Sequence, residues 1–153
     1  MAVIGIGFGQ HVHIPAFRAD PRSRVAAVCA STEERARKVA DRLEIENAFG
    51  NWREACARPD VDAVSISVPA ALQPEIVRLA ARHGKHVFCE KPLATTEEGA
   101  RSALESAVSA DVVHAMDFEF RAIPQWRRAR EICRSGAVLG RLRQIAVTWR
   151  VET

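Results

Sequence analysis

Long apolar runs, a leader segment and blocks of like charge are all missing from this 153-residue sequence. No stretch reaches the roughly 18 apolar residues that a membrane-spanning helix needs, and the N-terminus lacks the basic region and apolar core of a signal peptide. Lysine and arginine number 22 against 19 acidic residues, a net charge of +3, and the two signs are interspersed. Charge therefore predicts neither a nucleic-acid surface nor a membrane surface. We expect a soluble, cytoplasmic protein.

Paired metal ligands are also scarce. The sequence has no Cys-x-x-Cys pair. Its four cysteines are widely spaced, and three of these cysteines lie inside apolar stretches. This pattern favours free thiols in a reducing compartment over disulfides. His11 and His13 stand two residues apart without a third ligand nearby in the sequence. We therefore predict no metal site. The cysteines are Cys29, Cys56, Cys89 and Cys133.

What the sequence does contain is an ordinary globular composition, with 48% apolar and 27% charged residues. A chain of this length buries roughly 68–70% of its unfolded surface, enough for a core of its own. Length alone favours one domain, or one domain and part of a second.

Short apolar runs alternate with amphipathic stretches along most of the chain. The runs predict strands at 1–6, 25–29, 61–68, 85–89 and 111–116. Helices are predicted before residue 20 and at 31–43, 51–58, 74–83, 95–109 and 125–134, two of them opened by capping boxes at Ser31 and Thr95. This alternation is typical of βαβ units, so we predict an α/β fold with a doubly wound parallel sheet.

The last residues follow a different pattern. From Gln144 to Glu152 apolar and polar side chains alternate strictly, which predicts a strand with one apolar face. Such a strand needs partners. It either joins the edge of the α/β sheet or begins a further domain whose remainder is missing. We favour the second, with an α/β domain at 1–121 and, at 122–153, a connecting helix and the start of a truncated domain.

A glycine-rich turn ends the first predicted strand. Gly5 and Gly7 occupy the first two positions of the dinucleotide-binding fingerprint, but the third position is Gln10, with Gly9 one place early. Small residues there let the backbone approach a pyrophosphate, and the next helix supplies N–H donors. The alternative is an ordinary strand-to-helix turn, and the βαβ context favours the nucleotide loop.

No carboxylate follows the second predicted strand, where an NAD-selective site places Asp or Glu. Ser31 and Thr32 stand there instead, with Arg35 on the next helix. Hydroxyls and a guanidinium suit a 2′-phosphate, so we predict that the cofactor is NADP in preference to NAD. The alternative is that Ser31 only caps its helix and that Arg35 is solvated.

An apolar strand delivers Glu90 and Lys91 to the carboxyl edge of the predicted sheet, and Pro92 follows. The proline restricts Lys91 to an extended conformation. An ammonium group in a partly desolvated cleft can hydrogen-bond a substrate oxygen and exchange a proton with it. For an isolated motif of this kind, a strand-end salt bridge is the alternative.

In combination these motifs resemble the Gfo/Idh/MocA family, named for glucose-fructose oxidoreductase, inositol dehydrogenase and a rhizopine catabolism protein. The resemblance covers nearly the whole chain and rests on the turn at 5–9, the P-x-x-x-Q segment at 69–73 and the stretch at 84–94, with further matches at 62–64, 118–121 and 135–140. It implies a Rossmann fold and hydride transfer between NAD(P) and a carbon of a sugar, cyclitol or related polyol.

The resemblance also implies roles for individual residues. Lys91 would contact the substrate and assist proton transfer. Cofactor contacts would come from Gly5, Gly7, Phe8, Gly9 and Gln10 at the pyrophosphate, from Val68, Pro69 and Leu72 along the cofactor, from Glu90 and Pro92 at the nicotinamide end, and from Arg121 at the cleft edge.

The sequence departs from the family pattern in two ways. Gln73 stands where the family often has a histidine. Members are more than twice as long, and their second domain supplies further catalytic residues and the sheet through which a full-length protein would form homo-oligomers. A non-catalytic nucleotide-binding module is therefore the alternative function.

Overall fold

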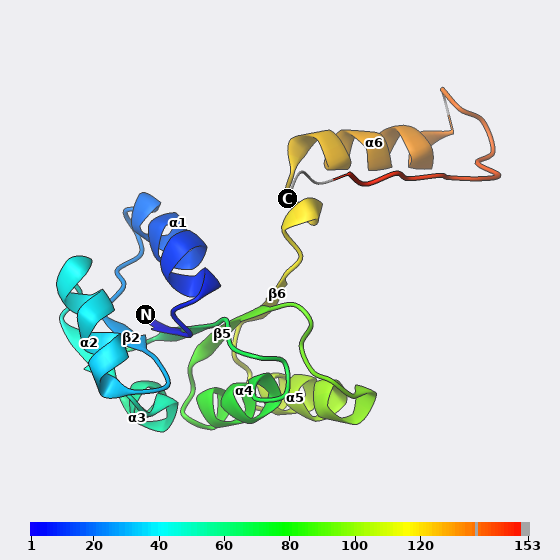
Figure 1. Cartoon of the computed structure of the whole chain (residues 1–153). Coiled ribbons are helices and arrows are strands. Elements are labelled where there is room, and N and C mark those ends of the chain that lie inside the picture. The colour runs from blue at the N-terminus through cyan, green and yellow to red at the C-terminus, as the bar shows by residue number, and fades with distance from the viewer. Residues whose placement is uncertain (137, 151–153) are drawn as a thin grey trace. The chain divides into compact units, whose positions relative to one another are not determined.

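The computed structural model describes residues 1–136 and 138–150, and the chain divides into two compact units, Met1–Asp117 and Phe118–Thr153 (Figure 1). The division proposed at residue 121 from the sequence stays a prediction. None of the helices in the described ranges combines the length and the apolar character of a transmembrane segment.

The first unit is built on a six-stranded parallel sheet with the order β3-β2-β1-β4-β5-β6. The order reverses between β1 and β4, which is where doubly wound folds place their ligands. The predicted α/β fold is confirmed. The strands are β1 (Ala2–Ile4), β2 (Ala27–Cys29), β3 (Asn47–Phe49), β4 (Ala63–Ile66), β5 (His86–Glu90) and β6 (His114–Asp117).

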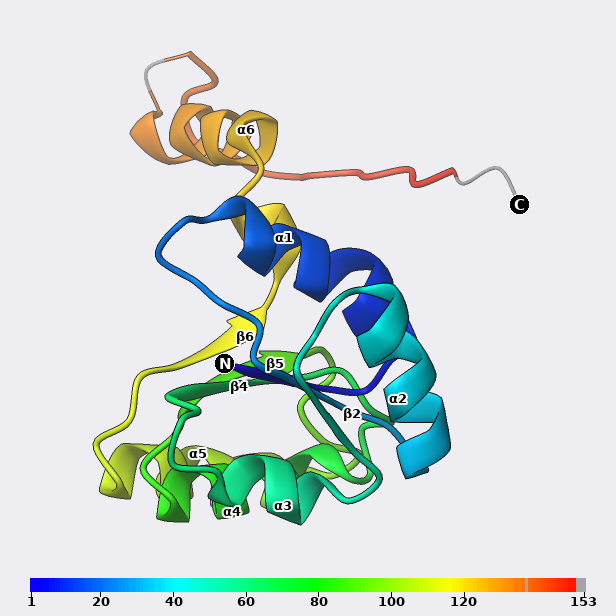
Figure 2. The same cartoon turned by 90° about the vertical axis from the view of Figure 1, so that its left-hand side faces the viewer.

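Helices cover both faces of this sheet. Figure 2 shows α3, α4 and α5 side by side beneath the sheet and α1 on its opposite side. The first unit contains η1 (Gly9–His13, a π-helix), α1 (Ile14–Ala19), α2 (Glu33–Arg42), α3 (Trp52–Ala57), α4 (Gln73–Arg82) and α5 (Glu97–Ser109). The second unit contains η2 (Glu119–Arg121) and α6 (Pro124–Ser135).

The core has two main parts, one on each face of the sheet, and successive side chains of β1 belong to them in alternation. Ile4 packs in the cluster that includes α3 and α4 residues, whereas Val3 packs with Ile14 of α1 and Ala36 of α2. Successive strand residues face opposite sides of a sheet, so a strand covered by helices on both sides is apolar throughout. This explains why β1 reads as a continuous apolar run in the sequence.

Two helix caps lie one residue later than predicted. Thr32 rather than Ser31 caps α2, with its side-chain oxygen accepting from the Arg35 N–H at 3.3 Å. Thr96 rather than Thr95 caps α5 by the same contact to Gly99 at 3.1 Å. Each site has two adjacent hydroxyl residues, and the capping-box pattern does not distinguish them. Ser31 is thereby left available for another contact.

The predicted strand at 144–152 is not formed in its described part, 144–150. The segment does not join the α/β sheet, whose edges are β3 and β6. The second alternative, the start of a further domain whose remainder is missing, stays a prediction, and a one-faced strand needs a neighbour to pair with. Ile145, Val147 and Trp149 are exposed. Residues 151 and 152 lie outside the described residues. Gly136 ends α6 in the left-handed conformation, which glycine adopts readily at the C-terminal end of a helix.

All four cysteines are free thiols, and the three in apolar stretches are buried, as predicted. Burial raises the pKa of Cys29, Cys56 and Cys89 to about 12. These thiols are therefore protonated at neutral pH and act as packing residues rather than nucleophiles.

Candidate functional site

The glycine turn begins directly after β1 and is fixed by contacts to the neighbouring strands. Gly5 has a φ of +101°, and a Cβ on it would lie 2.2 Å from the backbone oxygen of Ser67. Its N–H donates to the carbonyl of Cys29 at 2.9 Å, and its carbonyl accepts from the Ser67 hydroxyl at 3.1 Å. The positive φ and the close Ser67 oxygen mean that only glycine fits this position. The two hydrogen bonds hold the turn between the carboxyl ends of β2 and β4.

Gly7 and Gly9 differ in their surroundings. A Cβ on Gly7 would meet no atom within 4 Å, whereas one on Gly9 would lie 2.6 Å from Ser67 Oγ and 3.0 Å from a methyl group of Val3. Gly9 therefore provides the close helix–strand packing that the fingerprint assigns to its third position, one residue early. Gly7 leaves its side of the turn open to a ligand.

Gln10, which stands at the third fingerprint position, is partly exposed. Its side-chain oxygen accepts a hydrogen bond from Arg42 at the end of α2. The segment Gly9–His13 forms a π-helix before α1 begins. The larger turn of a π-helix is consistent with the displaced glycine.

A cavity of about 420 Å³ opens at the carboxyl ends of β1, β2 and β4. It brings together seven of the residues that the sequence predicts as cofactor contacts, namely Gly5, Gly7, Ser31, Arg35, Val68, Pro69 and Leu72. Its remaining lining is mostly apolar and consists of Ile4, Ile6, Cys29, Ala30, Trp52, Ser67 and Ile76. No residue of this lining carries a carboxylate.

One side of the cavity carries a hydroxyl–guanidinium pair. Arg35 Nη1 donates to Ser31 Oγ at 2.8 Å, and both residues are exposed. Lys38, one turn further along α2, instead forms an ion pair with Glu34 at 2.6 Å. Arg35 has no ion pair with any carboxylate in the described part of the chain. It is thus a cation available to an anionic ligand.

Glu90 ends β5 at the same edge of the sheet, and Lys91 and Pro92 follow it. The Lys91 N–H donates to Glu90 Oε2 at 3.0 Å, and the Pro92 carbonyl accepts from Gln73 Nε2 at 2.6 Å. Gln73 Oε1 in turn accepts from the Cys89 thiol at 2.7 Å. The Glu90 side chain therefore holds the backbone N–H of Lys91, and the Gln73 side chain holds the backbone carbonyl of Pro92, the next residue.

The side chain of Lys91 is exposed. The partly desolvated cleft that the sequence interpretation assumes around this lysine is therefore not formed by the described residues of the chain. The physical reason is that Lys91 projects from the open edge of the sheet, where helices cover the two faces but not the strand ends.

His13 stands at the centre of a buried polar cluster. Its Nδ1 lies 2.7 Å from Ser65 Oγ, and its Nε2 lies 3.3 Å from Glu90 Oε1 and 3.5 Å from Asp117 Oδ2. The ligand atoms of His13, Glu90 and Asp117 all lie within 4.8 Å of one another, close enough to hold a metal ion.

The sequence argument that His13 lacks further ligands is therefore wrong, because its partners come from β5 and β6. His11 is exposed and lies outside this cluster. The hydrogen bonds satisfy the cluster without an ion, and the absence of a metal stays a prediction.

Several predicted contacts lie outside the cavity lining. Phe8 is 50% exposed, and its ring meets that of His13 edge-on at 5.4 Å. Thr32 caps α2, as described above. The other predicted residues that do not line the cavity are Gly9, Gln10, Glu90 and Pro92.

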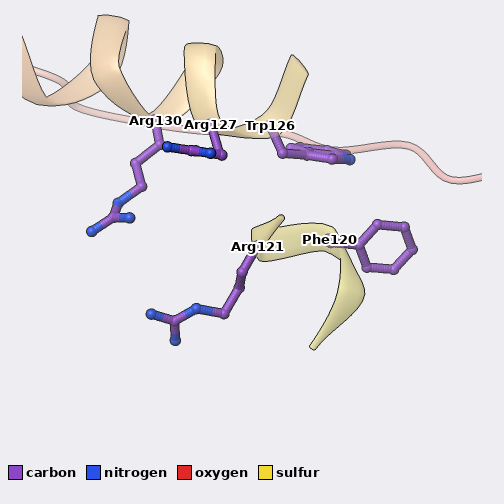
Figure 3. A pocket seen from close by; sticks show the side chains of 5 residues that line it. All are labelled: Phe120, Arg121, Trp126, Arg127 and Arg130. Atoms are coloured by element: carbon purple, nitrogen blue, oxygen red, sulfur yellow. The ribbon is translucent and has the colours of Figure 1, made fainter. Parts of the chain in front are cut away.

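Arg121 belongs to the second unit, and its role as a cofactor contact stays a prediction. Within that unit it lines a pocket of about 370 Å³. Figure 3 shows the rings of Phe120 and Trp126 at one end of this pocket, with the guanidinium groups of Arg121 and Arg130 extending away from them. The two rings meet edge-to-face at 6.3 Å.

Sequence reasoning missed three residues that shape the site. Ser67 contacts the glycine turn, and Ser65 and Gln73 hold polar groups beneath the carboxyl edge. The two serines lie inside an apolar run, where they carry no signal of their own. Gln73 is marked in the sequence by the P-x-x-x-Q segment and as a departure from the family pattern, and neither signal indicates its contacts.

Comparison with known proteins agrees with this geometry. Residues 1–118 match the family Gfo/Idh/MocA, described as an oxidoreductase family with an NAD-binding Rossmann fold. An uncharacterised oxidoreductase of Synechocystis is 36% identical over 151 residues, which are 99% of this chain and 40% of that protein. The NADP-dependent D-xylose 1-dehydrogenase 2 of Haloferax volcanii is 36% identical over 135 residues, which are 87% of this chain and 41% of the relative.

A solved structure shows the same fold. The 3-ketoreductase of Actinomadura kijaniata, crystallised with NADP and TDP-benzene, superposes with a TM-score of 0.80 at 31% identity, over 89% of this chain and 42% of that one. The chain thus spans about 40% of the length of the curated relatives it matches. With its glycine turn, its strand order and a family match over residues 1–118, the chain belongs to the Gfo/Idh/MocA oxidoreductase family.

Proposed function

We propose that this chain binds NADP(H), in preference to NAD(H), in the cavity at the carboxyl ends of β1, β2 and β4. One observation carries the proposal: the Ser31–Arg35 pair stands beside an open glycine turn in a cavity whose lining has no carboxylate. A 2′-phosphate would be repelled by the acidic residue of an NAD-selective site and is attracted by a guanidinium.

The lining fits the parts of this cofactor. The pyrophosphate would lie against Gly5 and Gly7, where the absence of side chains allows close backbone approach. The 2′-phosphate would be held by Ser31 and Arg35. Val68 and Leu72 supply apolar surface on the side formed by β4 and the segment that follows it.

The proposed reaction is an oxidation or reduction at a carbinol or carbonyl carbon of a sugar, cyclitol or related polyol. The bound nicotinamide supplies or accepts the hydride. Lys91 hydrogen-bonds the reacting oxygen and takes or returns its proton, while the Glu90 carboxylate holds the Lys91 backbone. Of the relatives named above, the D-xylose 1-dehydrogenase supports the sugar class, and the 3-ketoreductase supports reaction at a carbonyl carbon.

Cofactor titration tests the proposal. We expect NADPH to bind this chain at least about tenfold more tightly than NADH, because charge-assisted hydrogen bonds each contribute roughly 1.5–3 kcal/mol. Arg35→Ala should remove most of this preference by weakening NADPH alone. Arg37→Ala is the matched control, since Arg37 is an exposed residue of the same helix outside the cavity lining. Absence of binding by either nucleotide would refute the proposal.

A further inference from the structure

His13 is an almost fully buried polar residue near the candidate site, with 2% of its surface exposed. The rings of Phe8, Phe17 and Phe88 lie around it, with centroids at 5.4, 6.3 and 5.5 Å. An imidazole buried among aromatic rings is unfavourable unless its nitrogens have hydrogen-bond partners. Both nitrogens of His13 have them.

The partners come from three strands. Ser65 belongs to β4, Glu90 ends β5 and Asp117 ends β6, whereas His13 itself ends η1, the helix that follows the glycine turn. Carboxylate oxygens accept hydrogen bonds, so Nε2 carries the hydrogen that it donates to Glu90, and Asp117 Oδ2 lies 3.5 Å from the same nitrogen. The Ser65 hydroxyl can serve Nδ1 as donor or acceptor. One ring thus joins the segment after the turn to the ends of two neighbouring strands.

Glu90 transmits this contact to the lysine. Its Oε1 faces His13 at 3.3 Å, and its Oε2 accepts the Lys91 N–H at 3.0 Å. Glu90 is buried, with 8% of its surface exposed, so its carboxylate has few alternative partners. The orientation of the carboxylate, and with it the backbone of Lys91, depends on the imidazole.

We propose that His13 is a positioning residue that orients Lys91 through Glu90. The catalytic meaning of this link rests on the proposed function, but the link itself does not. It couples the helix that follows the proposed pyrophosphate-binding turn to the residue that would exchange a proton with the substrate. Displacement of the ring would loosen Lys91 without removing any group that touches a ligand.

Amide hydrogen exchange followed by NMR on this chain tests the link. His13→Phe keeps a ring of similar shape among the aromatic neighbours and removes both nitrogens, and Glu90→Gln weakens the acceptor of the Lys91 N–H. We expect each change to speed exchange of the Lys91 amide about tenfold relative to the Val64 amide in the core. The double variant should exchange no faster than either single variant, because both act through one contact.

Two further variants make the test specific. His11→Phe is the matched control on the same helix, where the histidine is exposed, and it should leave Lys91 exchange unchanged. His13→Gln offers a side-chain N–H towards Glu90 and should restore Lys91 protection to within about twofold of the wild type. It also keeps the test decisive if His13→Phe fails to fold.

Unchanged Lys91 exchange in His13→Phe, or additive effects in the double variant, would overturn the inference. Stoichiometric zinc in the purified wild type that His13→Phe abolishes would also overturn it, because the cluster would then be a metal site. Failure of NADPH to bind would refute the proposed function while leaving these measurements intact.

Discussion

At the scale of single residues, the glycines of the turn have separate physical roles. Gly5 is required by its positive φ and by the Ser67 carbonyl beside it, Gly9 by packing against Ser67 and Val3, and Gly7 by neither. The fingerprint pattern shows that small residues are needed here, but it does not show which role each one has. The early position of the third glycine is explained by the packing of Gly9 against Ser67, which lies 58 positions later in the sequence.

We expect Gly7→Ala and Gly9→Ala to have opposite effects. The methyl group of Gly7→Ala meets open space, so the free energy of unfolding should be unchanged or about 0.4–1 kcal/mol higher. NADPH affinity should fall, because the methyl group occupies the side on which the pyrophosphate would approach. Gly9→Ala should cost about 1–3 kcal/mol through overpacking. Urea unfolding and nucleotide titration measure both effects, and equal stability losses in the two variants would contradict these assignments.

Thiol chemistry offers a second test at this scale. Because burial raises the pKa of Cys29, Cys56 and Cys89 to about 12, these side chains are almost entirely protonated at pH 8. A thiol reagent should therefore modify only the partly exposed Cys133 in the native state at this pH, and all four cysteines in denaturant. Rapid native modification of a second cysteine would show that the core is more open than described.

The sign of the pH effect follows from the same shifts. The folded chain keeps these thiol protons up to about pH 12, whereas the unfolded chain releases them near the ordinary thiol pKa of 9.0. The unfolded state thus binds fewer protons above pH 9, and stability falls as the pH rises through this range.

At the scale of elements, hydrophobic periodicity predicts most of the fold. Five of the six strands and the helices from α2 to α6 lie where alternating apolar and amphipathic stretches place them. The pattern does not predict β3, because Asn47–Phe49 has only one fully buried residue, Ala48. It also fails at 144–150, where strict alternation describes a strand without specifying a neighbour.

For the candidate site, the sequence predicts where the residues lie in the fold better than it predicts which side chains contact one another. Parallel strands place the glycine turn, Ser31, Pro69 and Lys91 at one edge, and sequence motifs mark each of them. The contacts of His13 with Glu90 and Asp117 join residues 77 and 104 positions apart, and no local pattern signals them. Likewise, the exposure of Lys91 depends on what covers the edge of the sheet, which local sequence does not specify.

At the scale of the whole molecule, the cofactor residues of the cavity all lie in the first unit. That unit holds the complete six-stranded sheet and both main parts of the core. Ligand-binding crevices of doubly wound folds form where the strand order reverses, and here β1 and β4 both belong to this unit.

We therefore expect a shortened chain of residues 1–117 to fold cooperatively and to bind NADPH within about threefold of the affinity of the whole chain. Thermal unfolding and nucleotide titration of the two chains would measure this. Arg121→Ala in the whole chain removes only the Arg121 side chain and is compared with the shortened chain, which lacks the whole second unit. A loss of affinity in both would contradict this expectation and would support the predicted cofactor contact of Arg121.

The most direct test of the central claim is a crystal structure of this chain with NADPH. We expect the pyrophosphate to lie against Gly7 and the 2′-phosphate to lie within hydrogen-bond distance of Ser31 and Arg35. A dinucleotide bound elsewhere, or bound in this cavity with its 2′-phosphate turned away from Arg35, would contradict this claim.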